Sequence, residues 1–201
     1  YVAIQNLQNN QWWSESAGGG FNSGVLVWNL GTVLVPQQTT WYYTHSNLNT
    51  QLVDNTSYWI VSKVFDRAGN EQIILTTNTF IVDRTSPTSV VNFPGDNIDP
   101  GYDSVLTITG TASDSFPGEL EVVELRIYRE SPAGYWNGND WVGQEVWISS
   151  GYFVSGTLQS STWSYTTVPG MWTSDAIYQI TSRARDKAGN RRNLGGVSYD
   201  R

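Results

Sequence analysis

The sequence is poor in the side chains on which most enzyme chemistry depends. Its 201 residues include no cysteine, one histidine and one methionine, and 14% of them are charged. Without cysteine the chain has neither disulfide bonds nor thiolate metal sites, so its stability must come from packing. We interpret the one histidine, His45, as a surface loop residue, because a histidine without a matched nucleophile is poorly specific for catalysis.

Long apolar runs and clusters of positive charge are also missing. No apolar segment approaches the ~20 residues that a membrane-spanning helix needs. The chain opens without the basic and apolar regions of a secretion signal, so we expect any signal or anchor to lie outside it. The formal net charge of −7 would repel nucleic-acid phosphates. We therefore expect no membrane span and no nucleic-acid partner.

What the chain has in abundance favours strands and turns. Aromatic residues make up 13% of it, and Gly, Ser, Thr and Asn are frequent. Alternating apolar and polar residues predict strands over residues 104–110 and 121–128. Further short strands are predicted at 144–149, 163–167, 178–185 and 196–199. Because helical periodicity is absent, we predict an all-β fold built from antiparallel strands.

A sequence repeat divides the chain. The segment YWIVSKVFDRAGN at Tyr58–Asn70 matches YQITSRARDKAGN at Tyr178–Asn190, an offset of 120 with 7 of 13 positions identical. Tryptophans recur at offsets of 119 to 123: Trp13 with Trp136, Trp28 with Trp147, and Trp41 with Trp163. We interpret these pairs as core or sheet-face residues. The repeat predicts two domains, residues 1–84 and 85–201.

The register of the repeat leaves the first domain incomplete. Tyr1 falls near Glu124 of the second repeat, which begins at residue 85, so the first repeat lacks roughly its first forty residues. Their counterparts in the second repeat form a linker and two strands. We expect the missing strands to come from a longer polypeptide or from another subunit by edge pairing. A complete repeat has about seven strands, the number in an immunoglobulin-like sandwich.

The motif AspXxxAlaGlyAsn lies between β-rich runs in both repeats. We predict a tight hairpin turn at each copy, because Asp accepts amide hydrogen bonds, Gly permits positive φ, and Asn tolerates the left-handed region. The residues assigned to these structural turns are Asp66, Gly69, Asn70, Asp186, Gly189 and Asn190.

Four short motifs carry a family resemblance. They are the strand from Tyr to AspXxxAlaGlyAsn, ValAspArgThrSerPro at 82–87, GlyThrAlaSerAsp at 110–114 and TyrTrpAsnGlyAsnAspTrp at 135–141. Together they resemble bacterial immunoglobulin-like repeats of large surface and secreted proteins. The resemblance implies tandem antiparallel sandwiches in an extracellular or cell-surface stalk, adhesin or fibre. It also implies neighbouring repeats or identical subunits as partners.

Acidic residues in predicted turns or next to the linker make calcium a candidate ligand: Asp66, Asp83, Asp96, Asp99, Asp103, Asp114 and Asp186. Asp96, Asp99 and Asp103 form the densest group, and Ca²⁺ takes several oxygens from such loops. Their spacing lacks the alternation and terminal Glu of an EF-hand, so turn formation is the favoured explanation and calcium the alternative. Bound calcium would stiffen the joint between the repeats. No other cofactor is expected.

The tryptophans raise a second functional class, carbohydrate binding. Tyr135, Trp136, Asn139 and Trp141 combine flat rings with amides that can stack on a sugar and hydrogen-bond to it. Against this, Trp136 matches Trp13, and a recurring strand position fits core packing better. Trp141 has no matched tryptophan and is predicted to be more exposed.

Carboxylates offer no recurring pair for glycoside hydrolysis. The second repeat has several and the matching part of the first has one: Glu119, Glu121, Glu124, Asp140 and Glu145 against Glu15. The lack of a recurring pair argues against an enzyme. Together with the family resemblance, it predicts a non-enzymatic structural module of a bacterial surface protein, a stalk or a fibre assembled by strand complementation. The alternative is a carbohydrate-binding module or adhesin.

Overall fold

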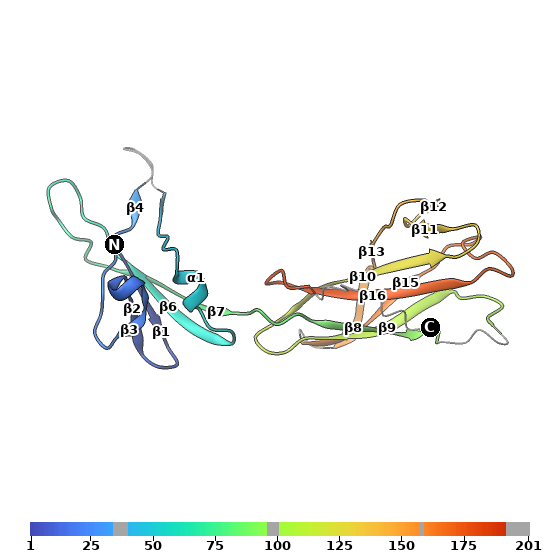
Figure 1. The fold of residues 1–201 in the computed structure, drawn as a ribbon, viewed down its shortest axis with the longest axis horizontal. Helices are drawn as coiled ribbons and strands as arrows, with labels where there is room; N and C mark the ends of the chain where they lie inside the picture. Colours follow the sequence, from blue (N-terminus) through green and yellow to red (C-terminus); the bar gives the residue numbers. More distant parts are fainter. Residues whose placement is uncertain (34–39, 96–100, 157–158, 192–201) are drawn as a thin grey trace. The chain divides into compact units, whose positions relative to one another are not determined.

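The computed structural model describes residues 1–33, 40–95, 101–156 and 159–191 (Figure 1). All of its sheets are antiparallel, as the sequence predicted, and their pairing is consistent with β-sandwich packing. The chain divides into two compact units, Tyr1–Asp83 (unit 1) and Arg84–Arg201 (unit 2). The sequence repeat placed this division one residue later, between 84 and 85.

The described residues of unit 1 form one five-stranded sheet and one two-stranded sheet. The larger sheet has the order β3-β2-β1-β6-β7, and the smaller pairs β4 with β5. A single helical turn, too short to give a periodic signal in the sequence, follows β5. The elements are β1 (Val2–Asn6), β2 (Gln11–Ser14), η1 (Ser16–Gly18), β3 (Gly20–Ser23), β4 (Thr32–Val33), β5 (Trp41–Tyr42), α1 (Leu48–Gln51), β6 (Thr56–Ser62) and β7 (Thr76–Val82).

Outside its undescribed residues, unit 2 forms a five-stranded sheet and a four-stranded sheet. In the first, β10 pairs with β16 along one edge and with β11 and β13 along the other, and β12 pairs with β11. The second has the order β14-β15-β9-β8. The strands are β8 (Thr88–Phe93), β9 (Thr107–Ser113), β10 (Leu120–Arg129), β11 (Gly134–Trp136), β12 (Trp141–Val142), β13 (Ile148–Ser149), β14 (Tyr152–Gly156), β15 (Ser160–Thr166) and β16 (Tyr178–Asp186).

Alternation along β10 forms one face of the unit 2 core. Val123, Leu125 and Ile127 are buried at two-residue spacing, as the sequence predicted for this strand. The strand predicted at 104–110 begins and ends three residues later in the structure, as β9, and Leu106 before it is 75% exposed. The error has a physical cause: two of the inward positions of β9 are Gly110 and Ala112, which are too small to give a strong hydrophobic pattern.

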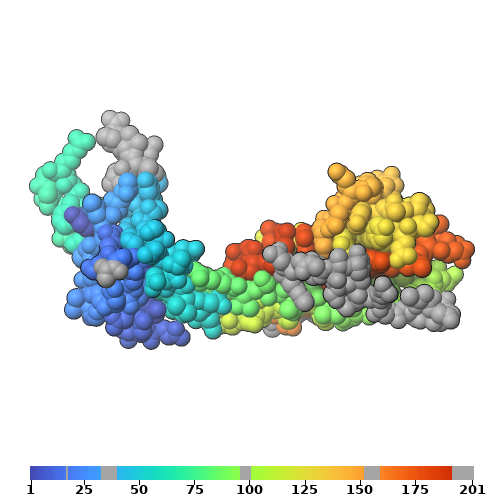
Figure 2. Space-filling view, in the orientation of Figure 1, coloured from blue at the N-terminus to red at the C-terminus, as the bar shows by residue number. Residues whose placement is uncertain are grey.

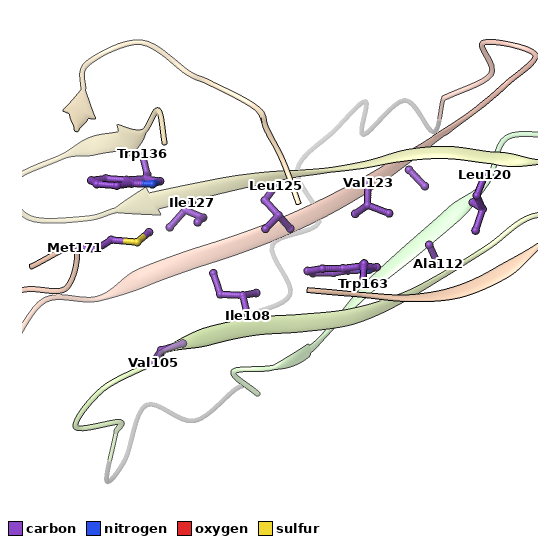
Figure 3. Close-up of a cluster of buried hydrophobic side chains, with 11 residues drawn as sticks. Val105, Ile108, Ala112, Leu120, Val123, Leu125, Ile127, Trp136, Trp163 and Met171 are labelled. Atoms are coloured by element: carbon purple, nitrogen blue, oxygen red, sulfur yellow. The ribbon is translucent and has the colours of Figure 1, made fainter. Parts of the chain in front are cut away.

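Trp163 occupies the space between the two sheets of unit 2. Figure 3 shows it on the inner side of β15, among Ile108 and Ala112 of β9 and Val123 and Leu125 of β10. The ring is fully buried, and its Nε1 donates to a backbone oxygen of β9 at 3.1 Å. At one edge of the unit the sheets are joined by a 2.9 Å hydrogen bond between hydroxyls of β8 and β16. Unit 2 is therefore closed around an indole ring.

Unit 1 has a smaller core. Val2, Ile4, Trp13 and Tyr58 are its buried apolar cluster, and the other apolar side chains packed against them are only partly buried. The residues between β6 and β7 project from the unit (Figure 2), and two apolar residues after their turn, Ile73 and Ile74, are 95% and 81% exposed. A large share of the apolar surface of unit 1 thus remains in contact with water.

Gly110 of β9 lets the backbone approach Trp163. A Cβ at this position would overlap the indole of Trp163 and the backbone oxygen of Val90. We predict that Gly110→Val lowers the free energy of unfolding of unit 2 by about 2–3 kcal/mol, because the indole is fully buried and the oxygen belongs to the paired backbone of β8. Urea denaturation followed by fluorescence measures it.

The matched control is Gly143→Ala, where the added methyl group meets no atom within 4 Å. Its effect should stay within about 0.5 kcal/mol. Equal stability of Gly110→Val and the unchanged chain would show that β9 does not pack against Trp163 as described.

Candidate functional site

A tryptophan–tyrosine hydrogen bond joins the two sheets of unit 2. Trp136 of β11 donates its indole Nε1–H to the hydroxyl oxygen of Tyr165 on β15 at 2.9 Å. Trp136 is 3% exposed, so its N–H has no ready access to water. A buried donor of this kind is costly to leave without a partner. The bond therefore fixes the sheets relative to each other.

Unit 1 contains the equivalent bond. Trp13 of β2 donates its Nε1–H to the hydroxyl of Tyr43, next to β5, at 2.6 Å. The Tyr43 hydroxyl in turn donates to Glu15 at 3.0 Å. Burial, reinforced by the Glu15 carboxylate, raises the pKa of Tyr43 to about 12, although the Trp13 hydrogen bond opposes the shift. The sequence signal for this bond is the recurrence of WYYT at 41–44 as WSYT at 163–166, in which Tyr43 and Tyr165 hold the same place.

A second tyrosine contact also occurs in both units. The hydroxyl of Tyr58 on β6 accepts the backbone N–H of Val53 at 2.8 Å, and that of Tyr178 on β16 accepts the N–H of Thr173 at 2.6 Å. Each bond attaches the loop before a strand to the first part of that strand. The tyrosines stand at the start of the matched segments, so the contacts recur at the same place.

Cations stack on matched tryptophans. The Lys63 ammonium lies 4.5 Å from the ring centre of Trp28, and the Arg183 guanidinium lies 3.9 Å from that of Trp147. Arg183 also donates to Glu124 at 2.7 Å. Trp28 and Trp147 are therefore partly exposed sheet-face residues covered by a cation.

The predicted turn residues of unit 1 lie together between β6 and β7. Asp66 accepts hydrogen bonds from the backbone N–H and the side-chain amide of Asn70, at 2.8 and 2.7 Å. These bonds, the side-chain one first, lower the pKa of the exposed Asp66 carboxyl. Gly69 has φ +91°, which only glycine adopts readily.

The turn of unit 2 has the same bonds in a buried setting. Asp186 accepts from the backbone and side-chain amides of Asn190 at 2.7 and 2.9 Å, and Gly189 has φ +90°. Asp186 is fully buried, and a carboxylate oxygen of Asp114 lies within 4.8 Å of one of its own. Two carboxylates at this spacing offer ligand atoms of the kind that Ca²⁺ takes.

The calcium candidates predicted from sequence are only partly visible. Asp96 and Asp99 lie outside the described residues, and Asp103 is exposed. Asp114 and Asp186 were among the loop aspartates considered for calcium, but the sequence did not indicate that they lie close together. The two residues are 72 positions apart in the sequence. The pairing of β16 with β10 sets Asp186 opposite Leu120, the first residue of the strand that follows Asp114.

The four glycan candidates are not equally accessible. Trp136 is buried in the core, Tyr135 and Trp141 are half-buried, and Asn139 is exposed. The ring of Trp141 lies 4.4 Å from the Arg129 guanidinium and packs against the core, and its Nε1 donates to a backbone oxygen at 3.3 Å. Much of the indole is therefore already engaged within the protein.

The other candidates for chemistry take part in local contacts. His45 lies in a loop, where its Nδ1 accepts the backbone N–H of Asn47 at 3.2 Å and its ring contacts Trp13 edge-on. Glu119 and Glu121 form ion pairs with Lys187 and Arg185 across the first sheet of unit 2. Neither helical segment in the described ranges could span a membrane.

The strongest difference between the units concerns Trp41 and Trp163, which the sequence predicted to be matched core or sheet-face residues. The β4–β5 register sets Val33 opposite Trp41, just as β14–β15 sets Phe153 opposite Trp163. Trp163 is fully buried, whereas Trp41 is 40% exposed. The expectation that both are packed is wrong for Trp41, because no strand equivalent to β9 pairs with β5 among the residues described in unit 1. We call Trp41, Tyr42 and the free edge of β5 the open edge.

Comparison of the chain with family models, curated proteins and solved structures found no match.

Removing the tyrosine hydroxyl tests the bond between sheets. Tyr165→Phe leaves the buried N–H of Trp136 without its acceptor, so we predict a loss of about 2 kcal/mol from the free energy of unfolding of unit 2. Chemical denaturation of the full chain measures it. The control is Tyr128→Phe, because Tyr128 lies on the face of β10 that points away from the core. This variant should change the free energy of unfolding little. An equal loss in both variants would contradict the assignment.

The raised pKa of Tyr43 predicts a pH dependence in unit 1. Because its folded pKa of about 12 exceeds the reference value of 10.0, its contribution to stability is complete below pH 10 and is lost as the pH rises toward 12. The stability difference between the unchanged chain and Tyr43→Phe should shrink over this window. Urea midpoints between about pH 9 and about pH 12 measure it, and a constant difference would contradict the prediction.

Proposed function

We propose that this chain is a non-enzymatic structural module of a bacterial extracellular or cell-surface protein. In this proposal residues 1–84 and 85–201 are tandem immunoglobulin-like sandwiches, the first of them incomplete, and they form part of a stalk or fibre. The antiparallel sheets packed around buried tryptophans support the sandwich assignment. The motifs that resemble bacterial immunoglobulin-like repeats support the location.

The recurrence of the tryptophan–tyrosine bond carries the proposal. It links Trp13 with Tyr43 and Trp136 with Tyr165, at sequence offsets of 123 and 122. The Asp–Asn turns and the stacked cations recur as well. All of these contacts stabilise strands, turns or sheet packing. The features that the two units share are thus contacts that hold the fold together. This fits a role in bearing load or in spacing other domains.

A load-bearing role predicts cooperative mechanical unfolding. When the chain is pulled by its two ends, unit 2 should unfold in one discrete step, because its sheets are joined through a common core and a hydroxyl bond at the edge. Tyr165→Phe should lower the force of that step, and Tyr128→Phe should leave it unchanged. Gradual extension of unit 2 without a discrete step would contradict the proposal.

Carbohydrate binding is the competing hypothesis, and a glycan screen separates it from the first. Binding that disappears in Trp141→Ala and survives in Trp147→Ala would favour a glycan-binding module over a purely structural one. Thermal unfolding of both variants is needed beside the screen, since Trp141 packs against the core.

A further inference from the structure

The outer face of the five-stranded sheet in unit 1 carries a row of paired residues. Gln5 of β1 stands opposite Trp12 of β2 on one side and opposite Trp59 of β6 on the other. Each of the three is the sequence neighbour of a buried core residue, so strand alternation directs it to the face that points away from the core. The rings of Trp12 and Trp59 contact each other, with centres 5.6 Å apart. The row is therefore one aromatic surface with an amide in its middle.

The polar groups of this row are available to a ligand. The indole N–H groups of Trp12 and Trp59 make no hydrogen bond with the residues that the structure describes, and neither nitrogen is enclosed by them. The side-chain amide of Gln5 donates one N–H to the backbone oxygen of Asn10 at 3.2 Å. This bond holds the amide in place and leaves its oxygen and its second N–H for another partner. In contrast, the indole N–H is bonded within the protein in Trp13, Trp136, Trp141, Trp147, Trp163 and Trp172.

Unit 2 has the same groups at the same sheet positions. Tyr128 of β10 stands opposite Tyr135 of β11 and opposite Gln179 of β16, at offsets of 123, 123 and 120 from the row of unit 1. The two tyrosine rings lie 4.9 Å apart. All members of both rows are partly exposed, so this exposure does not depend on the strands that distinguish the units. Two aromatic rings and one glutamine recur although their places are exchanged. The units therefore share a combination of groups at this face.

The composition of the unit 1 row favours an uncharged ligand. Ser23 of β3 and Thr79 of β7 extend the pairing, so the row crosses all five strands without an ionisable side chain. An anionic polymer would find no counter-charge in the row and would be repelled by the net charge of −7. Flat rings can stack on the C–H face of a sugar, while indole N–H and amide groups bind its hydroxyls. A neutral saccharide meets both conditions.

We propose that Trp12, Gln5 and Trp59 bind an uncharged polysaccharide made of equatorially linked pyranose rings. Such a chain is extended and flat, so one sugar can stack on an indole while its neighbour bonds to the amide. The row of unit 2 is the weaker site, because the amide of Gln179 already donates to the Glu130 carboxylate at 3.0 Å. This inference goes beyond the structural role proposed above, and it uses a different surface from the competing carbohydrate hypothesis.

The test labels the full chain with 5-fluorotryptophan and adds cellohexaose or N-acetylchitohexaose, both uncharged chains of this kind. The fluorine resonances of Trp12 and Trp59 are identified by their loss in Trp12→Phe and Trp59→Phe. At least one sugar should shift both resonances and leave that of Trp163 unchanged, because the Trp163 ring is fully buried in unit 2. Trp59→Gln introduces the residue that unit 2 has at this place, and it should weaken binding by at least about tenfold. Trp59→Phe keeps a flat ring and should retain most of the binding.

Three results would overturn the inference. The first is unchanged Trp12 and Trp59 resonances with both sugars at their solubility limits. The second is binding of full strength in Trp59→Gln. The third is loss of binding in Trp141→Ala, which leaves the row of unit 1 intact and would place the site in unit 2. The mechanical test of unit 2 involves no residue of the unit 1 row, so the structural proposal and this inference can fail separately.

Discussion

An amphipathic sheet is stable only when its apolar face is covered. In each unit the second, smaller sheet is the covering layer, and a tryptophan–tyrosine hydrogen bond attaches it to the five-stranded sheet. The bond spans the two sheets of unit 2 from Trp136 to Tyr165, and its equivalent in unit 1 runs from Trp13 to Tyr43. An indole N–H inside an apolar core needs an acceptor, so the hydrogen bond restricts where the strand that carries the tyrosine can lie. The remaining packing follows from that constraint.

The units differ in how far the covering layer extends beyond this bond. In unit 2 it has four strands, and Trp163 is enclosed between them and the first sheet. In unit 1 the described part of the layer has two short strands, and Trp41 faces solvent. The same local motif therefore accompanies a closed core in unit 2 and an exposed strand edge among the described residues of unit 1. The presence of β8 and β9 accounts for the difference.

The sequence predicted the class of fold and much of its local detail. Alternation identified β10, and the AspXxxAlaGlyAsn motifs correspond to turns with the bonds that Asp and Asn make in such places. The recurrence of Trp41 and Trp163 correctly paired two strand positions. It could not reveal their different burial, since burial depends on a strand far away in the sequence. Long-range pairing also explains why Asp114 and Asp186 were not recognised as neighbours.

Hydrogen exchange compares the covering layers most directly. We expect slow exchange of the amides in β15, Ser160–Thr166, which are held by β9 and β14, and fast exchange of those in β5, Trp41–Tyr42. The two segments can be followed in one sample of the unchanged chain by mass spectrometry of its peptides. Equal protection of β5 and β15 would contradict the central claim that unit 1 presents an uncovered strand edge.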